Sequence, residues 1–516
     1  NDLVEDEIRD LVAGTFLENA PIVRTSATTG MGMDEVRGHL AAAATKSLET
    51  RPRSTDGAPF PMAIDRTFTS AGHGTVVTGS VSSGNCKLGE DLIIEPGAVK
   101  VRIRGLQNHD RSVEALHRGQ RAAINLAGIH HEQIGRGQEL ATVGHLKPSR
   151  LLTVRIQMVA EPSRPLKNRS RIRLHVGTAD LAATVVLLDA DMLRAGEIGL
   201  AQLFLAEPTV STWNQPFVLR SPSPVVTIGG GQVLVPDAEK IRKPDAKLLK
   251  WVAQLRSEDP VERASAAIYF AGLREWQPHD LARTAGVDTT DTVYATLCEQ
   301  GIVAELPVSP TRTLLVHQEV LNEVCARIEA VLANLHQLNP LRTAIEQSQI
   351  KKAFGYLDDV VLRETLKIMR QQGRVAFSTQ GVTLDGHGPK LTQNERKLLG
   401  QLIDQYRDAG LQTPTVKQAQ QAATKNQNSV PHLIELAVAS GDLVQVASDF
   451  YIHQDVDQRL QEELVEHIAP GKGLTLSEIR EILKTSRKYA VPYCEYLDRI
   501  GFTRREGDLR VLAKQD

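Results

Sequence analysis

Residues 72–81 read GHGTVVTGSV, and this stretch decides how the first half of the chain folds. From Thr75 onward it is rich in β-branched side chains, which favour a strand. A strand rather than a helix therefore follows the glycines at its start, so the stretch does not fit the glycine-rich turn of a dinucleotide-binding domain. Short apolar runs follow at 92–94, 99–103 and 122–126, separated by Gly, Asn and Asp. The pattern predicts a small antiparallel β-barrel over residues 58–147.

A second β-rich block extends over residues 148–238. Its apolar runs lie at 152–159, 170–176, 181–188, 199–205 and 217–221, and their spacing predicts a second antiparallel barrel. Three successive glycines, residues 229–231, lie near its end. No helix start follows them, so we interpret them as a tight turn or a β-bulge rather than a phosphate-binding loop.

Downstream of residue 238 the composition turns helical and a repeat appears. Gly301, Gly373, Gly441 and Gly501 recur at intervals of 72, 68 and 60 residues. Each follows an amphipathic helix and precedes two short apolar runs, which predicts a left-handed glycine at a helix end and then a β-hairpin. The pattern predicts four tandem winged-helix domains, at 239–318, 319–388, 389–454 and 455–516. The part from about residue 440 onward has its own helices, turn and wing, and we expect it to fold by itself.

The first 57 residues have a different pattern. Apolar positions predict a helix over 2–18, then a short strand at Ile22-Val23, a loop, and a helix from Met33 to about Leu48. These elements are typical of the closing portion of an α/β sheet whose earlier strands are missing. The chain begins with Asn1 rather than Met, and we interpret it as truncated or processed.

The composition excludes several classes of protein. At roughly 150 residues per domain, 516 residues make about three to four domains. Sixty Lys and Arg against 62 Asp and Glu leave a formal charge of −2, which excludes a uniformly basic nucleic-acid binder but not local basic patches. No apolar run approaches the roughly 18 residues that cross a bilayer. The four cysteines lie far apart, which excludes a disulfide scaffold and a thiolate metal site and favours a reducing cytoplasm.

Several pieces of sequence carry a resemblance to a known family. Residues 64–68 (IDRTF), the stretch 72–81 and Gly84 resemble the second domain of translational GTPases of the elongation factor Tu class. Two barrels followed by four winged helices are similar to the bacterial selenocysteine-specific elongation factors. Residues 483–490 (LKTSRKYA), with 499–505 and 510–512, resemble the RNA-binding last winged helix of that family. The resemblance implies a multidomain fold: the remnant of an α/β GTPase domain over 1–57, two antiparallel β-barrels, then four tandem winged-helix domains.

One departure from the family concerns the nucleotide site. The family's GTPase domain carries G-x-x-x-x-G-K-[ST], D-x-x-G and [NT]-K-x-D, and this sequence contains no phosphate loop of the first form. The resemblance assigns Asp2 to the guanine-binding end of [NT]-K-x-D, and Ser26 and Ala27 to the loop that supports the base. An exposed Asp and an ordinary strand-to-helix Ser fit the sequence equally well. We therefore expect GTP, Mg²⁺ and GTPase activity in the complete protein, and no catalytic residue, cofactor, metal or activity in this chain.

The resemblance also places the aminoacyl end of a tRNA beside the first barrel. A selenol is ionised near neutral pH and the hydroxyl of serine is not, so a nearby cation gains a charge-assisted hydrogen bond of about 1.5–3 kcal/mol only with selenocysteine. On the matching positions we nominate Arg66, oriented by Asp65, and Arg121, with His73 as a weaker candidate. A plain surface ion pair is the alternative.

Five cations in the second barrel are candidates for the phosphates of the tRNA. No acid interrupts them, and strand alternation would put Arg169, Arg171 and Arg173 on one face. A charge run is, however, often only a solvated surface. The five are Arg164, Lys167, Arg169, Arg171 and Arg173.

The last winged helix contains a second basic segment. Residues 484–510 include seven basic and four acidic residues. A serine and two cations stand where a recognition helix would begin, so its amides and side chains can bind an RNA hairpin loop together with the arginines of the wing. Tyr489 either stacks on a base or is buried. The candidates are Ser486, Arg487, Lys488, Tyr489, Arg504, Arg505 and Arg510. The earlier winged helices lack such a concentration of cations, and we interpret them as a spacer.

The function implied by the resemblance is delivery of selenocysteinyl-tRNA to the ribosome at UGA codons marked by a messenger RNA hairpin. The expected partners are that tRNA, the messenger hairpin and the ribosome, with no membrane, for a cytoplasmic monomer. A winged-helix DNA-binding regulator with an appended barrel is the alternative from another class, because winged helices alone do not separate DNA from RNA. A translational GTPase that delivers another tRNA is a third, against which the four winged helices argue.

Overall fold

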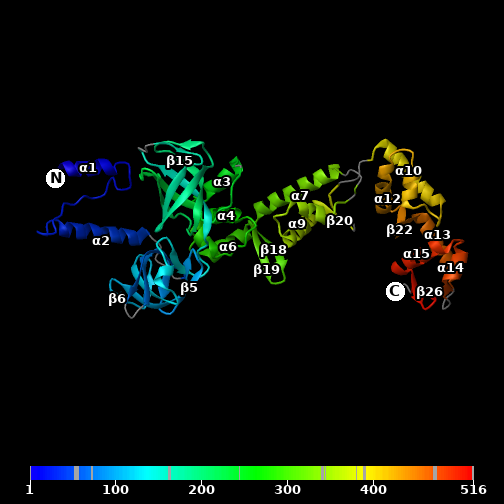
Figure 1. Ribbon diagram of the computed structural model, residues 1–516, viewed down its shortest axis with the longest axis horizontal. Coiled ribbons are helices and arrows are strands. Elements are labelled where there is room, and N and C mark those ends of the chain that lie inside the picture. Colours follow the sequence, from blue (N-terminus) through cyan, green and yellow to red (C-terminus); the bar gives the residue numbers. More distant parts are fainter. Residues whose placement is uncertain are drawn as a thin grey trace. The chain divides into compact units, whose positions relative to one another are not determined.

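The computed structural model describes residues 2–50, 57–70, 74–160, 164–242, 244–338, 342, 344–378, 381–386, 391–468 and 473–513 (Figure 1). The chain divides into two compact units, Asn1–Val303 and Ala304–Asp516.

The first unit begins with two helices, α1 (Asp2–Val12) and α2 (Met33–Thr50). None of the side chains of α1 is buried, and Leu3, Leu11 and Phe16 are 79%, 80% and 95% exposed. The predicted strand at Ile22-Val23 is wrong, because this segment pairs with no other strand in the part of the chain that the structure describes. A strand needs a neighbouring strand to satisfy its backbone groups.

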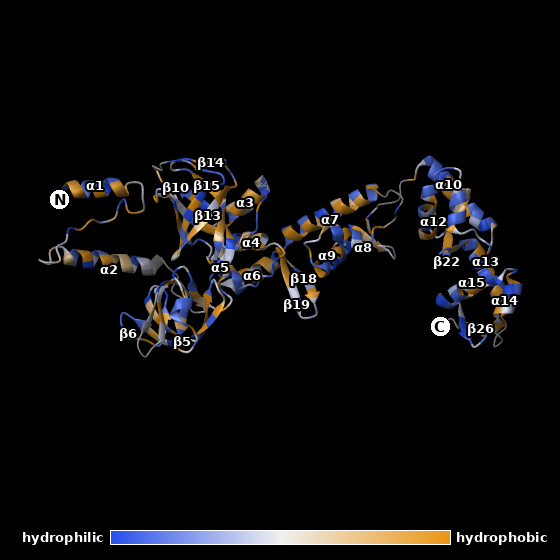
Figure 2. Cartoon of the chain, viewed as in Figure 1, coloured by the Kyte–Doolittle hydropathy of each residue, from blue (hydrophilic) through white to orange (hydrophobic). Residues whose placement is uncertain are grey.

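The first barrel is a closed antiparallel sheet. Its strands follow the order β4 (Asp91–Glu95), β9 (Glu139–Thr142), β1 (Pro61–Ser70), β2 (Gly74–Val81), β8 (Arg121–Ala127) and β5 (Val99–Asn108), and β5 pairs back with β4. β6 (Arg111–Ser112) extends β5, β3 (Asn85–Lys87) pairs with β7 (Ala115–His117), and η1 (His131–Gln133) is a 3-10 turn. Hydrophobic and hydrophilic residues are mixed over this barrel (Figure 2). Buried residues alternate with more exposed ones along β5 and β8, so one face of the sheet forms a core around Phe60, Met62, Ile64 and Ile124.

The second barrel is also closed. Its order is β10 (Ser149–Met158), β15 (Ile198–Thr209), β13 (Ala179–Leu187), β12 (Arg171–Val176), β16 (Pro216–Arg220) and β17 (Thr227–Val235), with β17 pairing back to β10. A small pair, β11 (Leu166–Lys167) and β14 (Met192–Leu193), lies outside this ring. Leu152, Val154, Leu174, Val185 and Leu203 are fully buried at its centre. The prediction of two barrels is confirmed.

The glycines at 229–231 lie inside a strand and not in a tight turn, and the register between β16 and β17 shifts directly before Gly229, next to the predicted position of a β-bulge. All three belong to β17, which is paired with β10 on one side and β16 on the other. A Cβ on Gly231 would lie 1.9 Å from the carbonyl oxygen of Arg155, and one on Gly230 would lie 2.8 Å from that of Phe217. The glycines therefore allow a close approach of the neighbouring strands. The sequence could not show this, because a run of glycines carries no alternation.

We expect Gly231→Ala to destabilise the second barrel by more than about 2 kcal/mol, because its clash is relieved only by moving β17 away from β10. Urea unfolding, with hydrogen exchange of the β10–β17 amides, measures the effect. Gly105→Ala in the first barrel is the control, since its Cβ would meet the nearest atom at 3.6 Å. Equal losses in the two variants would contradict the close-approach explanation.

Four helical regions, each ending in a two-stranded hairpin, follow the barrels, as predicted. The first comprises α3 (Ala246–Gln254), α4 (Pro260–Ala271), α5 (Asp280–Ala285), α6 (Thr290–Glu299), β18 (Val303–Ser309) and β19 (Arg312–His317). The second comprises α7 (Gln318–Leu338), α8 (Gln347–Ala353), α9 (Asp359–Gln371), β20 (Val375–Ser378) and β21 (Gly381–Leu384). The third comprises α10 (Gln393–Asp408), α11 (Val416–Ala422), η2 (Gln427–Ser429), α12 (Val430–Ala439), β22 (Leu443–Ala447) and β23 (Phe450–His453). The fourth comprises α13 (Gln454–His467), β24 (Leu474–Thr475), α14 (Leu476–Ile482), α15 (Arg487–Arg499), β25 (Thr503–Glu506) and β26 (Leu509–Leu512).

The same turn ends the last helix of every unit. Gly301, Gly373, Gly441 and Gly501 have φ values of 66°, 69°, 85° and 76°, in the left-handed region. The amide of the residue after each glycine donates to the carbonyl five residues before it, as in Phe502 to Leu497 at 3.0 Å. This is the Schellman pattern, which satisfies the last carbonyls of the helix and sends the chain into the wing. The repeat read from the glycines is thus confirmed.

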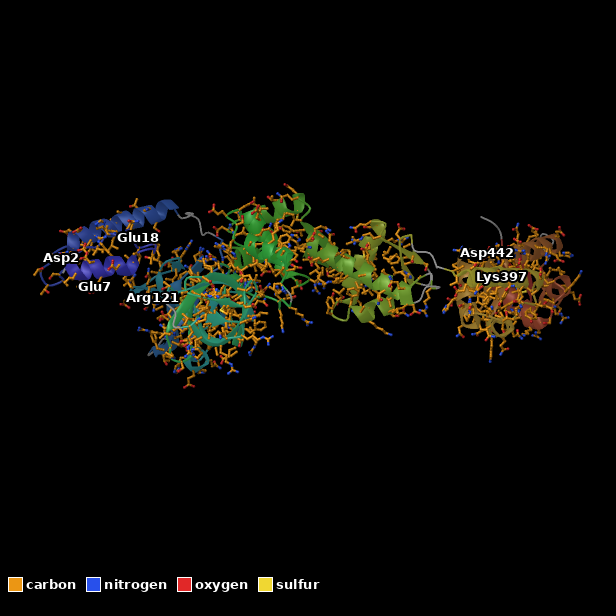
Figure 3. All side chains as sticks on the ribbon, turned by 90° about the horizontal axis from the view of Figure 1, so that it is seen from above. Asp2, Glu7, Glu18, Arg121, Lys397 and Asp442 are labelled. Atoms are coloured by element: carbon orange, nitrogen blue, oxygen red, sulfur yellow. The ribbon has the colours of Figure 1, made fainter. Side chains whose placement is uncertain are left out.

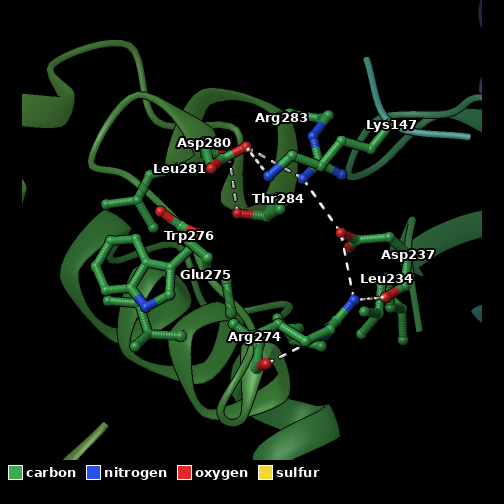
Figure 4. A pocket seen from close by; sticks show the side chains of 15 residues that line it. Lys147, Leu234, Asp237, Arg274, Glu275, Trp276, Asp280, Leu281, Arg283 and Thr284 are labelled. Atoms are coloured by element: carbon green, nitrogen blue, oxygen red, sulfur yellow. Dashed lines mark hydrogen bonds and ion pairs between the residues drawn. The ribbon is translucent and has the colours of Figure 1, made fainter. Parts of the chain in front are cut away.

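A buried ion network fastens the first winged helix to the second barrel. Asp237, just after β17, lies 3.3 Å from the guanidinium of Arg283 and 3.4 Å from that of Arg274. Asp280 in α5 binds the same Arg283 at 3.3 Å and Lys147 at 2.8 Å (Figure 4). Arg283 is 1% exposed, and a cavity of about 240 Å³ adjoins it. Because both carboxylates surround one buried cation, removal of either leaves its charge poorly compensated.

The last two winged helices share one hydrophobic core. Val446 and Ile452, from the hairpin of the third, are buried together with Leu460, Ile479 and Leu497 of the fourth. Arg499 of α15 donates to the carbonyl oxygen of Val446 at 2.9 Å. This shared core bears on the expectation that residues from about 440 onward fold by themselves, which stays a prediction. That cut keeps the hairpin but removes α10 and α12, against which Leu443 and Tyr451 pack.

Candidate nucleic-acid interface

The N-terminal candidates surround an ion pair. Arg24 binds Asp2 at 2.6 Å and Glu5 at 2.7 Å, and Asp2 lies at the start of α1 (Figure 3). Ser26 accepts a hydrogen bond from the amide of Thr29 at 3.3 Å, and Ala27 follows it in the same turn. Asp2 is thus bound by a cation of the chain itself rather than standing unpaired for a base.

The polar groups of these residues are used within the segment itself. Within the described ranges, no three His, Cys, Asp or Glu side chains come together as metal ligands. Ser26 belongs to a turn that precedes α2, and its hydroxyl is used inside that turn. We derive no step through GTP or Mg²⁺ from this segment.

A β-bulge organises the predicted aminoacyl pocket on the first barrel. Ile64 faces Gly79 and Arg66 faces Thr78, so Asp65 is the extra residue of β1. The bulge turns its carboxylate toward two partners: Thr78 donates to one oxygen at 2.7 Å, and Arg121 of β8 donates to the other. Asp65 and Arg121, which are 56 residues apart in the sequence, are thereby brought together.

Arg66 is placed differently from the expectation. Its side chain is exposed, and in the described part of the chain no hydrogen bond or ion pair reaches it. Asp65 therefore orients Arg121, not Arg66. His73 lies outside the described residues. Of the two nominated arginines, Arg66 is the one whose guanidinium is available to a ligand.

The pKa of Asp65 reports this arrangement. Partial burial alone would raise it, but the hydrogen bonds from Arg121 and Thr78 and the charges of Arg121 and Arg66 outweigh burial and hold the pKa below its usual value. Because the folded pKa is lowered, the stabilisation is present above the usual pKa of an aspartate and is lost as pH falls through the lowered one.

We expect Arg121→Ala to raise the pKa of Asp65, because burial then acts against one hydrogen bond fewer and less positive charge. Arg66→Ala should raise it much less, since Arg66 contributes only charge at a distance. Carbon-13 NMR titration of selectively labelled aspartate side chains measures both. Equal shifts in the two variants would contradict the assignment of Asp65 to Arg121.

The five cations of the second barrel do not share one strand face. Arg169 lies in a turn with φ of 62°, before β12 begins at Arg171, so its predicted place in the strand is wrong. Arg173 donates to Asp180 across the β12–β13 hairpin at 2.9 Å, and this contact lowers the pKa of Asp180. Asp180 directly follows residues 163–179, which contain no Asp or Glu, so the sequence around these cations does not reveal it. The exposed cations of the set are Arg164, Lys167, Arg169 and Arg171.

Arg220 is a candidate that the sequence did not reveal. It lies on β16 directly opposite Arg173, and its side chain is exposed. The hydrogen bond from Arg173 and the charges of His175 and Arg220 lower the pKa of Asp180. No local signal could have found Arg220, because only the strand register brings it to this surface.

The start of α15 presents the predicted cations to solvent. Arg487 and Lys488 are both exposed, and Ser486 is the N-cap residue by its backbone although its hydroxyl makes no capping bond. Tyr489 is half-buried and packs on Phe450, with ring centroids 5.6 Å apart. Tyr489 therefore serves the shared core, which leaves the two cations as the accessible groups.

The three arginines of the last wing have different environments. Arg510 is poorly accessible to RNA, because its side chain is 9% exposed and binds Asp498 at 3.0 Å. Arg504 pairs with Glu506, and Arg505 donates to the carbonyl of Gly507 at 2.9 Å. Arg504 and Arg505 are successive residues of β25 and so point to opposite faces of the hairpin.

Comparison with known proteins agrees with this architecture. Three family descriptions match segments of the chain: "Elongation factor Tu domain 2" over 74–141, "Selenocysteine-specific elongation factor, beta-barrel domain" over 153–240, and "Elongation factor SelB, winged helix" over 466–512. The selenocysteine-specific elongation factor of Desulfomicrobium baculatum is 27% identical over 100% of this chain and 80% of its own length. The chain is similar over its whole length to the selenocysteine-specific elongation factors.

Further relatives match over a similar share of the chain. The Escherichia coli selenocysteine-specific elongation factor is 25% identical over 99% of this chain and 79% of its own length. The crystal structure of a bacterial selenocysteine-specific elongation factor superposes with a TM-score of 0.54 at 20% identity, covering 99% of this chain and 78% of that one, which supports the fold. Where the structure describes the chain, no helix combines the length and apolarity that a membrane crossing requires.

Proposed function

We propose that this chain binds selenocysteinyl-tRNA and a messenger RNA hairpin and delivers the tRNA to the ribosome at UGA codons. The single observation that carries the proposal is the exposed pair Arg487 and Lys488 at the start of α15, within the segment that matches the SelB winged helix. Cations at a helix start, with amides that have no partner in the helix, suit the phosphates and bases of an RNA hairpin loop. The factor would act in the cytoplasm as a monomer.

The first barrel would distinguish the aminoacyl group. Arg66 has an available guanidinium, whereas Arg121 is held by Asp65 beside it. A selenolate gains a charge-assisted hydrogen bond from Arg66 that the neutral hydroxyl of seryl-tRNA does not gain. Arg121 and Asp65 would fix the shape of the site, and the second barrel would bind phosphates of the tRNA stem through Arg164, Lys167, Arg169, Arg171 and Arg220.

The proposal is tested by comparing a messenger stem-loop with duplex DNA at matched salt. Anisotropy titration of the chain should show tighter binding to the stem-loop, with loop-base changes costing more than swaps of stem pairs. Equal affinity for duplex DNA would instead favour the DNA-binding regulator.

We also propose that this chain does not use GTP, although its family consists of translational GTPases. Calorimetric titration with GTP and Mg²⁺ should be nearly flat, because Asp2 is bound by Arg24 and the sequence has no G-x-x-x-x-G-K-[ST] loop to hold phosphates. Submicromolar binding would contradict this prediction.

A further inference from the structure

The four winged helices differ in the charge of one helix. In each unit the helix that precedes the glycine turn is the second of the helix-turn-helix, the one that contacts nucleic acid in such folds. α6 (TDTVYATLCE) and α12 (VPHLIELAVA) contain no Lys or Arg. α15 contains Arg487, Lys488 and Arg499, and α9 (DVVLRETLKIMRQ) contains three cations as well. α9 therefore does not fit the spacer interpretation that the sequence suggested for its unit.

The cations of α9 share one face. Arg363, Lys367 and Arg370 follow the i, i+4, i+7 spacing that aligns side chains along a helix. All three are exposed, while Val361, Leu362, Thr365, Leu366 and Met369 form the buried face. The guanidinium of Arg370 lies over the ring of Phe377, 5.5 Å from its centroid. The face is thus a cationic stripe on a helix whose other side is fixed in the domain core.

The acids near this face neutralise only part of it. Glu364 binds Lys367 at 2.8 Å and lies 3.9 Å from Arg363. Asp359, in the first turn, is paired with Lys351 of α8 at 2.6 Å. Of the three cations on this face, Arg363 and Arg370 are the least neutralised by nearby carboxylates. Exposed ion pairs of this kind contribute little to the stability of the protein, so the cation can readily exchange its acidic partner for a phosphate.

The placement of the acids also indicates how a nucleic acid would approach. Asp358 caps α9 and Asp359 follows it, so the helix start repels phosphates, unlike that of α15. The cations lie in the middle and last turns. A helix that contacts phosphates along its side, and not with its start in the groove, holds the backbone without reading bases.

We propose that the exposed face of α9 binds the phosphate backbone of double-stranded RNA, independently of sequence, as a second contact beside that of α15. The choice of RNA over DNA rests on the proposed function, whereas the contact itself rests on the stripe. The factor would then bind RNA at two separate places: a hairpin loop through α15, and a double-stranded segment through α9.

The test uses the full chain with an RNA duplex of about 16 base pairs that has no loop. The background is Arg487→Glu with Lys488→Glu, which removes the contact of α15. The test variant adds Arg363→Glu and Arg370→Glu to this background. A control with the same change of charge adds Arg396→Glu and Lys397→Glu on α10 instead; Lys397 is labelled in Figure 3. All four positions are exposed, so circular dichroism should show unchanged folding.

The α9 variant should weaken duplex binding by about tenfold or more at low salt, and flatten the plot of log affinity against log salt by about two units, more than the control does. Two duplexes of unrelated sequence should lose affinity alike. Losses equal to those of the control, confined to one sequence, or as large on duplex DNA would each overturn the proposal. The parent reversal at Arg487 and Lys488, measured on the stem-loop, tests the proposed function separately.

Discussion

Reversing the two exposed cations at the start of α15, Arg487→Glu with Lys488→Glu, will lower the affinity of the chain for a messenger stem-loop by about a hundredfold or more at low salt. Two phosphate contacts are lost, which flattens the slope of log affinity against log salt by about 1.5–2 units, and the new carboxylates repel the loop. The measurement is fluorescence anisotropy over a series of salt concentrations.

The arginines of the last wing provide matched comparisons for this result. Arg504→Ala removes one exposed cation and should flatten the salt slope by about one unit. Arg510→Ala should leave the slope of the folded protein unchanged and lower its stability, because Arg510 is buried against Asp498. A double reversal that keeps the wild-type slope, or an Arg510 variant that changes it, would place the RNA contact elsewhere in the unit.

Cutting the chain between the last two winged helices will unfold the fourth. Residues 391–516 retain both domains and the shared core and should unfold cooperatively, whereas residues 455–516 lose Leu411, Val446 and Ile452 from that core. Loss of three buried aliphatic side chains amounts to about 5 kcal/mol or more, comparable with the whole stability of a small domain. Urea unfolding followed by circular dichroism, with amide NMR spectra of both fragments, measures the difference.

The affinity of each fragment for the stem-loop shows whether a fragment that folds has also kept its RNA-binding surface. The fragment 391–516 should still bind the stem-loop, since it contains all of α15 and its supporting core, but less tightly than the full chain because it lacks the cations of α9. A well-dispersed spectrum and a cooperative transition for 455–516 would show that the shared core is not required. Asp457→Asn in the longer fragment offers a milder version, because its carboxylate accepts hydrogen bonds from Tyr493 at 2.9 Å and Tyr496 at 3.1 Å.

The sequence by itself determined the order of the domains. β-branched runs between turn residues predicted both barrels, because strand alternation and turn chemistry are local properties of the chain. Gly501 and its three counterparts predicted four helix ends with a wing after each, because a left-handed residue is needed wherever such a helix ends. The cations at 487 and 488 were also found from sequence, since a helix start needs only its own few residues.

Only the tertiary structure decided which of the candidate cations are paired with acids of the chain and which are open to RNA phosphates. Arg510 is paired with Asp498, Arg173 with Asp180, and Arg121 with Asp65. The glycines at 229–231 likewise depend on the strands beside them. Each outcome depends on which residue lies opposite another across a hairpin or a barrel. Strand register and bulges set that pairing, so a cation can be held by an acid that lies far from it in the sequence, and no local pattern reveals that acid.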